Sequence, residues 1–258
     1  GPTFIKLGQI MSMRTDILPE EYCIELKKLQ TGVPPMDFST VKKIIEGSYG
    51  LPLEEVFTAF DEEPIGSASI AQVHKAILKD GRVVVAKVQR ENIYEIMSRD
   101  IALLKKALKM LKPTRITGEL IDFNMVLNEM WQVAKQEMDF LIEAVHLKEF
   151  AKLNKDIVYV TCPEVIMEHT NSRVLVMEYV KGTQIDKIHE LKKLGYDLND
   201  IGEKLANNYV KQILEDAFFH ADPHPGNIRI EDGKIVWLDL GMMGKLTLND
   251  QKLLRKAV

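Results

Sequence analysis

The chain contains little cysteine, no long apolar run and no strong excess of charge of either sign. Cys23 and Cys162 are its only cysteines in 258 residues, and their spacing matches no zinc site, which indicates a reducing compartment or simple burial. No apolar run reaches the roughly 18 residues that a transmembrane helix requires. The formal net charge of −4 argues against nucleic acid as a partner, because no excess of basic residues faces the phosphates.

The remaining composition is that of an ordinary globular protein. Hydrophobic residues make up 46% of the chain and charged residues 28%. The length suits one two-lobed domain or two small ones. The chain lacks an initiator methionine and begins at Gly1-Pro2, inside what already has the pattern of a functional segment. We therefore expect it to be part of a longer protein.

The richest polar pattern lies near the C-terminus. Residues 220–227 read His-Ala-Asp-Pro-His-Pro-Gly-Asn, and a second aspartate, Asp239, follows a short apolar run. Protein kinases build their metal and nucleotide site with this spacing. Asp222 would face the acceptor group, while Asn227 and Asp239 would hold the divalent ions that bridge the ATP phosphates.

The segment between these ligands predicts a hairpin. Two β-rich runs, residues 228–230 and 235–238, flank the turn signal Asp232-Gly233. A hairpin would bring Asn227 and Asp239 to the same end, as two ligands of one metal cluster require.

Two further features lie in a strand-rich segment upstream. Lys87 interrupts an apolar strand, Val84–Val88, which is unusual unless the lysine points into a cleft and contacts phosphates. The alternative is that Lys87 lies on the solvent face of an edge strand.

The connection that precedes the strands 71–78 and 82–89 contains only one glycine, Gly66, followed by Ser67, Ala68 and Ser69. It lies where a kinase has its phosphate loop, although an ordinary strand connection is the alternative, and fewer glycines restrict its backbone.

Residues 119–153 have the pattern of one long helix that carries several carboxylates. Asp139 and Glu143 are four positions apart and would share a face. Glu137 and Glu143 are about 240° apart around such a helix, so they would point differently and do two jobs. One of these carboxylates would orient Lys87. The alternative is a solvated acidic face.

His220 and His224 flank Asp222. Histidine is a common metal ligand, so a zinc site is one interpretation. We favour a structural role for His220 and loop packing for His224.

The order of the elements predicts an α+β fold with two lobes, like that of protein kinases. We expect an N-terminal helical extension at 1–50, a small sheet-rich N-lobe at 51–180 and a mainly helical C-lobe at 181–258. The expected helices are 3–31, 39–45, 91–111, 119–153, 185–194 and 199–219. Within 3–31, Pro19-Glu20-Glu21 is expected to begin a second short helix, and Ser39 is the expected N-cap of the helix over 39–45, which Gly47 or Gly50 would end. The expected strands before the final hairpin are 56–60, 71–78, 82–89 and 173–179, with Lys79-Asp80-Gly81 joining 71–78 and 82–89 as a hairpin.

These residues together resemble the UbiB family, the ADCK-type atypical kinases, over residues 1 to about 245. Lys6-Leu7-Gly8-Gln9 is similar to the family's KxGQ motif, and residues 66–69 lie where the family has an alanine-rich loop. Glu137-Met138-Asp139 matches its ExD motif, followed by Glu143-Ala144. The general kinase positions are matched by Lys87, Asp222, Asn227 and Asp239. Gly66-Ser67 stands where alanines are common, so a shifted nucleotide preference is expected.

The resemblance implies a Mg²⁺-dependent (or Mn²⁺-dependent) ATPase that binds ATP and ADP and supports ubiquinone-type isoprenoid quinone biosynthesis. It implies that Lys6 is held by Glu137 and Asp139, that Lys87 pairs with Glu143, and that the KxGQ helix, with Gln9, blocks a protein substrate. Quinone-precursor lipids, quinone-biosynthesis enzymes and a membrane surface are the implied partners. The implied location is the bacterial inner membrane, the mitochondrial inner membrane or the plastid, although this chain has no transmembrane segment.

Two other functions fit part of the pattern. Small-molecule phosphotransferases of the aminoglycoside or choline kinase type carry a similar His-x-Asp-x-x-x-x-Asn loop, which His220–Asn227 matches. A catalytically inactive nucleotide-binding scaffold is the other alternative. The Lys6–Gln9 segment and the alanine-bearing loop favour the UbiB-like function over the phosphotransferase, and the presence of all four core polar residues disfavours the scaffold.

Overall fold

The computed structural model describes residues 1–12, 15, 18–27, 33–110, 115–116, 119–120 and 123–257. The contacts divide the chain into two compact units. The first comprises Gly1–Phe140 and Asn171–Leu175, and the second comprises Leu141–Thr170 and Val176–Val258. The bounds of these two units differ from the expected segments 1–50, 51–180 and 181–258. The division into an N-terminal extension and two lobes stays a prediction.

The first unit begins with short helices. The region 3–31, which was expected to be helical, contains α1 (Pro2–Ser12) and the expected second helix, α2 (Glu20–Lys27), and the end of that range lies outside the described residues. Pro19 precedes α2 as expected. The next helices are α3 (Phe38–Tyr49) and α4 (Leu53–Val56). The start of α3 was predicted wrongly, because Asp37 and not Ser39 is its N-cap; Gly50, at φ 68°, ends it in the left-handed conformation that glycine adopts without strain.

A mainly antiparallel sheet follows, in the segment where strands are expected. Its strands are β1 (Phe57–Phe60), β2 (Gly66–Ser67), β3 (Ala71–Leu78), β4 (Val83–Gln89) and β8 (Val174–Glu178). They run in the order β1-β3-β4-β8, with β2 paired to β3. The turn between β3 and β4 places Gly81 at φ 88°, so the expected hairpin is confirmed.

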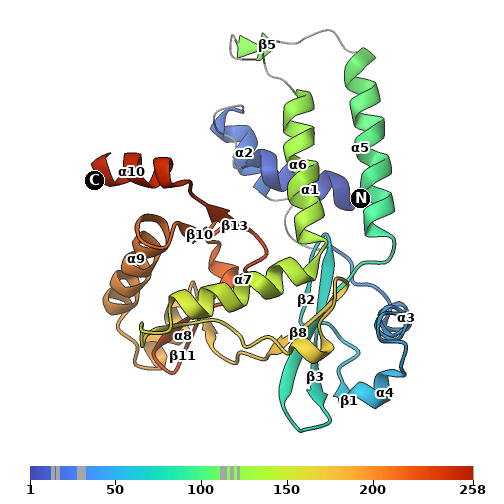
Figure 1. Cartoon of the computed structure of the whole chain (residues 1–258), viewed down its shortest axis with the longest axis vertical. Helices are drawn as coiled ribbons and strands as arrows, with labels where there is room; N and C mark the ends of the chain where they lie inside the picture. The colour runs from blue at the N-terminus through green and yellow to red at the C-terminus, as the bar shows by residue number, and fades with distance from the viewer. Residues whose placement is uncertain are drawn as a thin grey trace. The chain divides into compact units, whose positions relative to one another are not determined.

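The two long helices of the first unit are α5 (Ile93–Met110) and α6 (Phe123–Glu137), and the short strands β5 (Arg115–Ile116) and β6 (Glu119–Leu120) lie between them. Helices α1, α5 and α6 pack beside one another (Figure 1). Their interior consists of buried aliphatic side chains from all three helices, including Met11, Ile101, Val126, Leu127 and Met130. The buried residues of α1 are Thr3, Lys6, Gly8, Met11 and Ser12. Leu7 and Ile10 pack half-buried against the same core, whereas Phe4 is exposed.

The expected single helix over 119–153 was wrong. It is interrupted at residues 138–139, where α6 ends, and α7 (Phe140–Leu153) begins anew. The Phe140 amide donates to Ser172 O at 3.1 Å, and the Gln89 side chain donates to Met138 O. These partners satisfy backbone groups at the break. Glu137 and Glu143 consequently lie on different helices, so the 240° argument for their directions does not apply.

The second unit carries a smaller sheet and the C-terminal helices. Its sheet has the order β7-β12-β11-β9, and β10 pairs with β13. The bounds in chain order are β7 (Val160–Thr161), η2 (Met167–His169), β9 (Thr183–Gln184), α8 (Ile188–Lys193), α9 (Leu198–Leu214), β10 (Phe218–His220), η3 (Pro225–Asn227), β11 (Ile228–Glu231), β12 (Lys234–Trp237), β13 (Met243–Lys245) and α10 (Leu248–Ala257).

Helix α9 ends five residues before the expected position 219. Lys211 forms an ion pair with Asp216 at 2.6 Å, and Ala217 adopts a positive φ of 53°. The side chain of Gln251, on α10, donates to the carbonyls of Leu214 and Glu215 at 3.1 Å. The exposed carbonyls of this helix end are thereby satisfied. Within the described part of the chain, no helix combines the length and apolar character needed to span a bilayer.

Candidate functional site

The first group of site residues lies on three neighbouring strands of the first unit. Val73 of β3 is the cross-strand neighbour of Gly66 on β2 and also of Lys87 on β4. Directly opposed residues of antiparallel strands point to the same face, and strands are about 4.8 Å apart. Gly66 therefore lies roughly 10 Å across the sheet from Lys87, in one transverse row, so the short loop and the lysine share a face.

Lys87 lies on a central strand, because β4 runs between β3 and β8. This contradicts the edge-strand alternative. Its chain neighbours Ala86 and Val88 are fully buried, whereas Lys87 is half-buried, with its ammonium 5.5 Å from the centre of the Phe140 ring. A lysine on this strand reaches a partly open face of the sheet, where an anion can bind it.

The segment Gly66–Ser69 is a tight connection. Ala68 N donates to Ala71 O at 2.8 Å, and Ser69 is buried, while Gly66 and Ala68 are exposed. Its exposed backbone lies beside the row that contains Lys87. This is where a loop that covers phosphates is expected in the kinase arrangement.

The N-terminal helix is bound to the first unit by polar as well as apolar contacts. Lys6 forms an ion pair with Glu137, and both side chains are largely buried, at 7% and 16% exposure. Thr3 Oγ1 donates to Asp100 Oδ2 at 2.7 Å. The expected contact between Lys6 and Glu137 is therefore confirmed. The expected contact of Lys6 with Asp139, the role of Gln9 and the pairing of Lys87 with Glu143 remain predictions.

The second group of site residues lies in the second unit, around one buried histidine. His220 Nδ1 accepts a hydrogen bond from the Asp222 backbone N at 3.1 Å, and His220 Nε2 donates to Asp239 O at 2.6 Å. The Ala221 amide donates to Met242 O at 2.9 Å. His220 thus ties together the segments that carry the two aspartates. Its predicted structural role is confirmed, because both ring nitrogens are engaged by the protein.

The protonation state of His220 follows from these bonds. One ring nitrogen accepts and the other donates, which is the hydrogen-bonding pattern of neutral imidazole. Burial lowers the pKa of His220, and this outweighs the opposing effect of the Asp239 carbonyl and the neighbouring aspartates. His224 has a separate role, because its Nδ1 accepts from Gly226 N at 3.0 Å and shapes the loop before Asn227.

The predicted hairpin is present, with Ile228 opposite Trp237 and Glu231 opposite Lys234. At its open end, Leu238 N donates to Asn227 O at 2.8 Å. Asn227 and the segment leading to Asp239 therefore lie at the same end, as expected. Their side-chain oxygens are of the kind that Mg²⁺ prefers.

A bare glycine backbone lies between two carboxylates of this unit. A Cβ on Gly241 would lie 3.2 Å from Asp239 Oδ1 and 3.6 Å from Glu143 Oε2, and Gly241 N donates to Asp239 Oδ1 at 3.0 Å. A side chain at this position would occupy the space between the two acids. The oxygen donors and the bare backbone fit a hard divalent cation. Among the described residues, no cluster of three His, Cys, Asp or Glu side chains is arranged for a metal.

Two supports of the aspartate segment were missed from the sequence. His146 Nδ1 donates to Leu240 O at 2.9 Å, and its ring packs on Phe218 at 5.6 Å. His146 lies three positions after Glu143 on α7, hence on the same helix face, and this spacing is the signal that would have found it.

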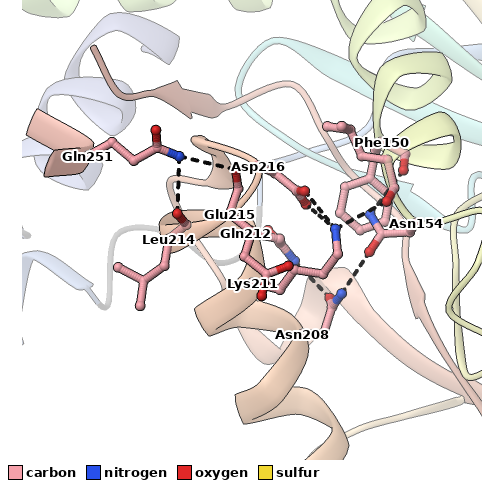
Figure 2. A network of polar contacts seen from close by, with 10 residues as sticks. Phe150, Asn154, Asn208, Lys211, Gln212, Leu214, Glu215, Asp216 and Gln251 are labelled. Atoms are coloured by element: carbon pink, nitrogen blue, oxygen red, sulfur yellow. Dashed lines mark hydrogen bonds and ion pairs between the residues drawn. The ribbon is translucent and has the colours of Figure 1, made fainter. Parts of the chain in front are cut away.

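The other missed support is a chain of buried amides, part of which is drawn in Figure 2. Asn208 Nδ2 donates to Asn154 Oδ1 at 2.8 Å, while Asn208 Oδ1 accepts from Gln212 Nε2 at 2.9 Å and from Trp237 Nε1 at 3.0 Å. Gln212 Oε1 in turn accepts from the His220 backbone N at 3.0 Å. This series of amide hydrogen bonds therefore connects α9 to His220. Its signal in the sequence was a pair of amide residues four positions apart on one helix.

Comparisons with known proteins agree with this geometry. A family model described as the ABC1 atypical kinase-like domain matches residues 28–258. The chain is 41% identical to Protein ACTIVITY OF BC1 COMPLEX KINASE 8, chloroplastic, from Arabidopsis thaliana, over all of this chain and 34% of that protein. It is 35% identical to a probable protein kinase UbiB from Cellvibrio japonicus, over 97% of this chain and 46% of that protein. The chain thus spans about a third to a half of these relatives.

A solved structure is also similar. The complex of Rv3197 with erythromycin from Mycobacterium tuberculosis superposes with a TM-score of 0.68 at 29% identity, covering 92% of this chain and 60% of that one. Together with the antiparallel sheets and the long helices, these matches confirm the predicted α+β, protein-kinase-like fold.

Proposed function

Because the chain belongs to the ABC1 atypical kinase-like family, which includes proteins named UbiB and ACTIVITY OF BC1 COMPLEX KINASE, we propose that it is a Mg²⁺-dependent ATPase of the phosphotransferase class. Its biological role in this proposal is to support isoprenoid quinone biosynthesis at a membrane surface. The observation that carries the proposal is the bonding of His220 to both the Asp222 and the Asp239 segments. A site whose polar groups are held before the substrate arrives avoids reorganisation during the reaction.

Each residue has a distinct role in this proposal. Lys87 contacts the α- and β-phosphates, and residues 66–69 cover the phosphates with their backbone. Asn227 and Asp239 hold Mg²⁺, which neutralises charge on the transferring phosphoryl group. Asp222 orients the attacking oxygen by accepting its hydrogen bond. Glu143 orients Lys87.

The acceptor in this proposal is water or a small headgroup rather than a peptide. The support is the fastening of α1 to the helices of the first unit by the Lys6–Glu137 ion pair and by buried apolar side chains. We propose that this helix acts as a gate that excludes a protein substrate. The proposed partners are adenine nucleotide, quinone-precursor lipids and quinone-biosynthesis enzymes.

The test is ATP turnover by the purified chain with Mg²⁺, with and without anionic vesicles that contain a quinone-precursor-like lipid. We expect turnover that rises with the vesicles and is lost on chelation. Asp239→Asn should abolish Mg-ATP-induced thermal stabilisation, because a hard cation needs an anionic oxygen. Asp232→Asn, at the turn of the same hairpin, is the matched control and should retain the stabilisation. A full thermal shift in Asp239→Asn would remove Asp239 from the metal role.

A further inference from the structure

Arg90 joins three parts of the first unit. It follows β4 directly and lies three positions after Lys87. Its Nε donates to Ala68 O at 2.8 Å, and its Nη2 donates to Ser67 Oγ at 2.8 Å and to Pro34 O at 2.9 Å. The planar guanidinium suits this geometry, because it presents several donors in a rigid fork.

The bonds of Arg90 hold the connection between β2 and β3 at successive points. Besides the Ser67 hydroxyl and the Ala68 carbonyl, the backbone N of Arg90 donates to Ile70 O at 2.8 Å. The loop itself adds the bond between Ala68 N and Ala71 O, and Gly66 and Ser67 pair with β3 as the short strand β2. Arg90 therefore adds side-chain bonds at Ser67 and Ala68 to the strand pairing that holds the segment which the proposed function places over the phosphates.

The third acceptor belongs to the segment 33–36, which precedes α3 in the chain. The same segment is held by Gln72, whose Oε1 accepts from Met36 N at 2.6 Å and whose Nε2 donates to Met36 O at 3.3 Å. Gln72 is the cross-strand neighbour of Ser67. Arg90 and Gln72 thus fasten the segment that follows the N-terminal helices to the phosphate loop.

The charge of Arg90 also matters. Its three hydrogen-bond acceptors are neutral oxygens, so these bonds do not neutralise the guanidinium. Arg90 is half-buried, and burial lowers its pKa, yet guanidinium stays protonated throughout the physiological range. A positive charge close to the loop favours the binding of a polyphosphate in addition to fixing the backbone.

We propose that Arg90 is a positioning residue for the nucleotide: it holds residues 66–69 in the phosphate-accepting conformation and couples that conformation to the segment 33–36. The inference rests on the proposed nucleotide-binding function and adds a residue that none of the kinase motifs contains. Arg90 acts through the loop and not by contact with the reacting atoms.

The experiment compares Arg90→Gln and Arg90→Lys with a matched control, Arg82→Gln. Arg82 lies at the opposite end of the β3–β4 hairpin and bonds to Asp80 at 2.7 Å. Amide hydrogen exchange is measured without nucleotide, and the affinities for Mg-ADP and Mg-ATP are measured by titration. In Arg90→Gln we expect at least tenfold faster exchange, confined to Met36 and residues 66–71, and about tenfold weaker nucleotide binding. Arg90→Lys keeps the charge but loses the fork, so its exchange should resemble that of Arg90→Gln while its affinity is partly restored. Arg82→Gln should match the wild-type chain in both measurements.

Other outcomes overturn the inference. If Arg90→Gln shows wild-type exchange in the loop, Arg90 does not position it. Exchange that rises uniformly over the first unit would assign Arg90 a general structural role instead. Should Arg90→Gln fail to fold, Ser67→Ala removes a single bond of the same cluster and must still speed exchange in the loop. Absence of nucleotide binding by the wild-type chain would defeat the proposed function, whereas the exchange comparison would still decide whether Arg90 holds the loop.

Discussion

Lys6 and Glu137 form an ion pair across 131 positions of the chain, and their side chains are 7% and 16% exposed. Removal of one member of a largely buried ion pair leaves an uncompensated buried charge, which destabilises the folded state by about 3 kcal/mol. We therefore expect Lys6→Ala to lower the free energy of unfolding by about that amount.

The same variant, Lys6→Ala, should change the affinity for ATP and permit autophosphorylation, because the contact that holds the proposed gate helix is weakened. Chemical denaturation, nucleotide titration and incorporation of labelled phosphate measure these effects.

The control for this prediction is an exposed pair. Lys42 and Glu54 are 2.6 Å apart with side chains 37% and 68% exposed. Lys42→Ala should leave the free energy of unfolding almost unchanged, because solvent screens an exposed pair. Equal losses in the two variants would show that burial does not strengthen the Lys6 pair.

Lys87 is expected to matter for turnover rather than for folding. Lys87→Met should slow ATP hydrolysis by about 10²-fold, roughly 3 kcal/mol, because a positioned charge at the phosphates is lost. Lys79→Met, at the exposed tip of the same hairpin, should leave turnover unchanged. Glu143→Gln should slow the reaction as Lys87→Met does, with little additional effect in the double variant. A silent Glu143→Gln together with a slow Glu137→Gln would mean that the assignment of the two glutamates is inverted.

Asn208 should be among the most sensitive polar positions of the second unit. Asn208→Leu removes the acceptor for Gln212 and Trp237 and leaves buried donors without partners, which costs about 2 to 4 kcal/mol. Asn207, its exposed neighbour on α9, provides the matched control, and Asn207→Leu should change stability by less than about 0.5 kcal/mol. Urea denaturation distinguishes the two. Similar stabilities would contradict the role assigned to the amide chain.

The burial of His74 leads us to expect that the stability of the protein depends on pH. It is fully buried in β3, its Nδ1 donates to Asp61 O at 2.8 Å, and its Nε2 accepts from Gln72 Nε2 at 2.9 Å. Burial lowers the pKa of His74 below the value of 6.5 in the unfolded chain. The unfolded chain therefore binds more protons between the folded pKa and 6.5, so the stabilisation is complete above pH 6.5 and is lost as the pH falls below it.

The measurement is the free energy of unfolding from pH 8 to pH 5 for the wild-type chain and His74→Gln. The wild type should lose up to about 1.4 kcal/mol more per pH unit below 6.5, which is the effect of one proton. His146 and His220 contribute to both chains, because burial also lowers their pKa values, and so they cancel in the difference. Identical slopes would exclude His74 as a contributor.

Several features were correctly predicted from local patterns. The hairpin that brings Asn227 and the Asp239 segment to one end follows from two β-rich runs around Asp232-Gly233, and both turn residues adopt positive φ. The strands around Lys87 follow from apolar, β-rich runs on either side of a turn that contains Gly81. Turns and neighbouring strands of this kind depend on residues that are close together in the chain, so the sequence alone determines them.

The break at residues 138–139 and the hydrogen bonds of His220 could not be predicted in this way. The periodicity of residues 119–153 continues through the break, but the partners that end α6 and start α7 are Gln89 and Ser172, which are distant in sequence. His220 is likewise defined by partners on α9 and at Asp239. The sequence by itself thus determined which residues carry the chemistry and the turns between them. Only the tertiary structure decided which buried groups satisfy one another, because a hydrogen bond depends on distance in space and not on separation along the chain.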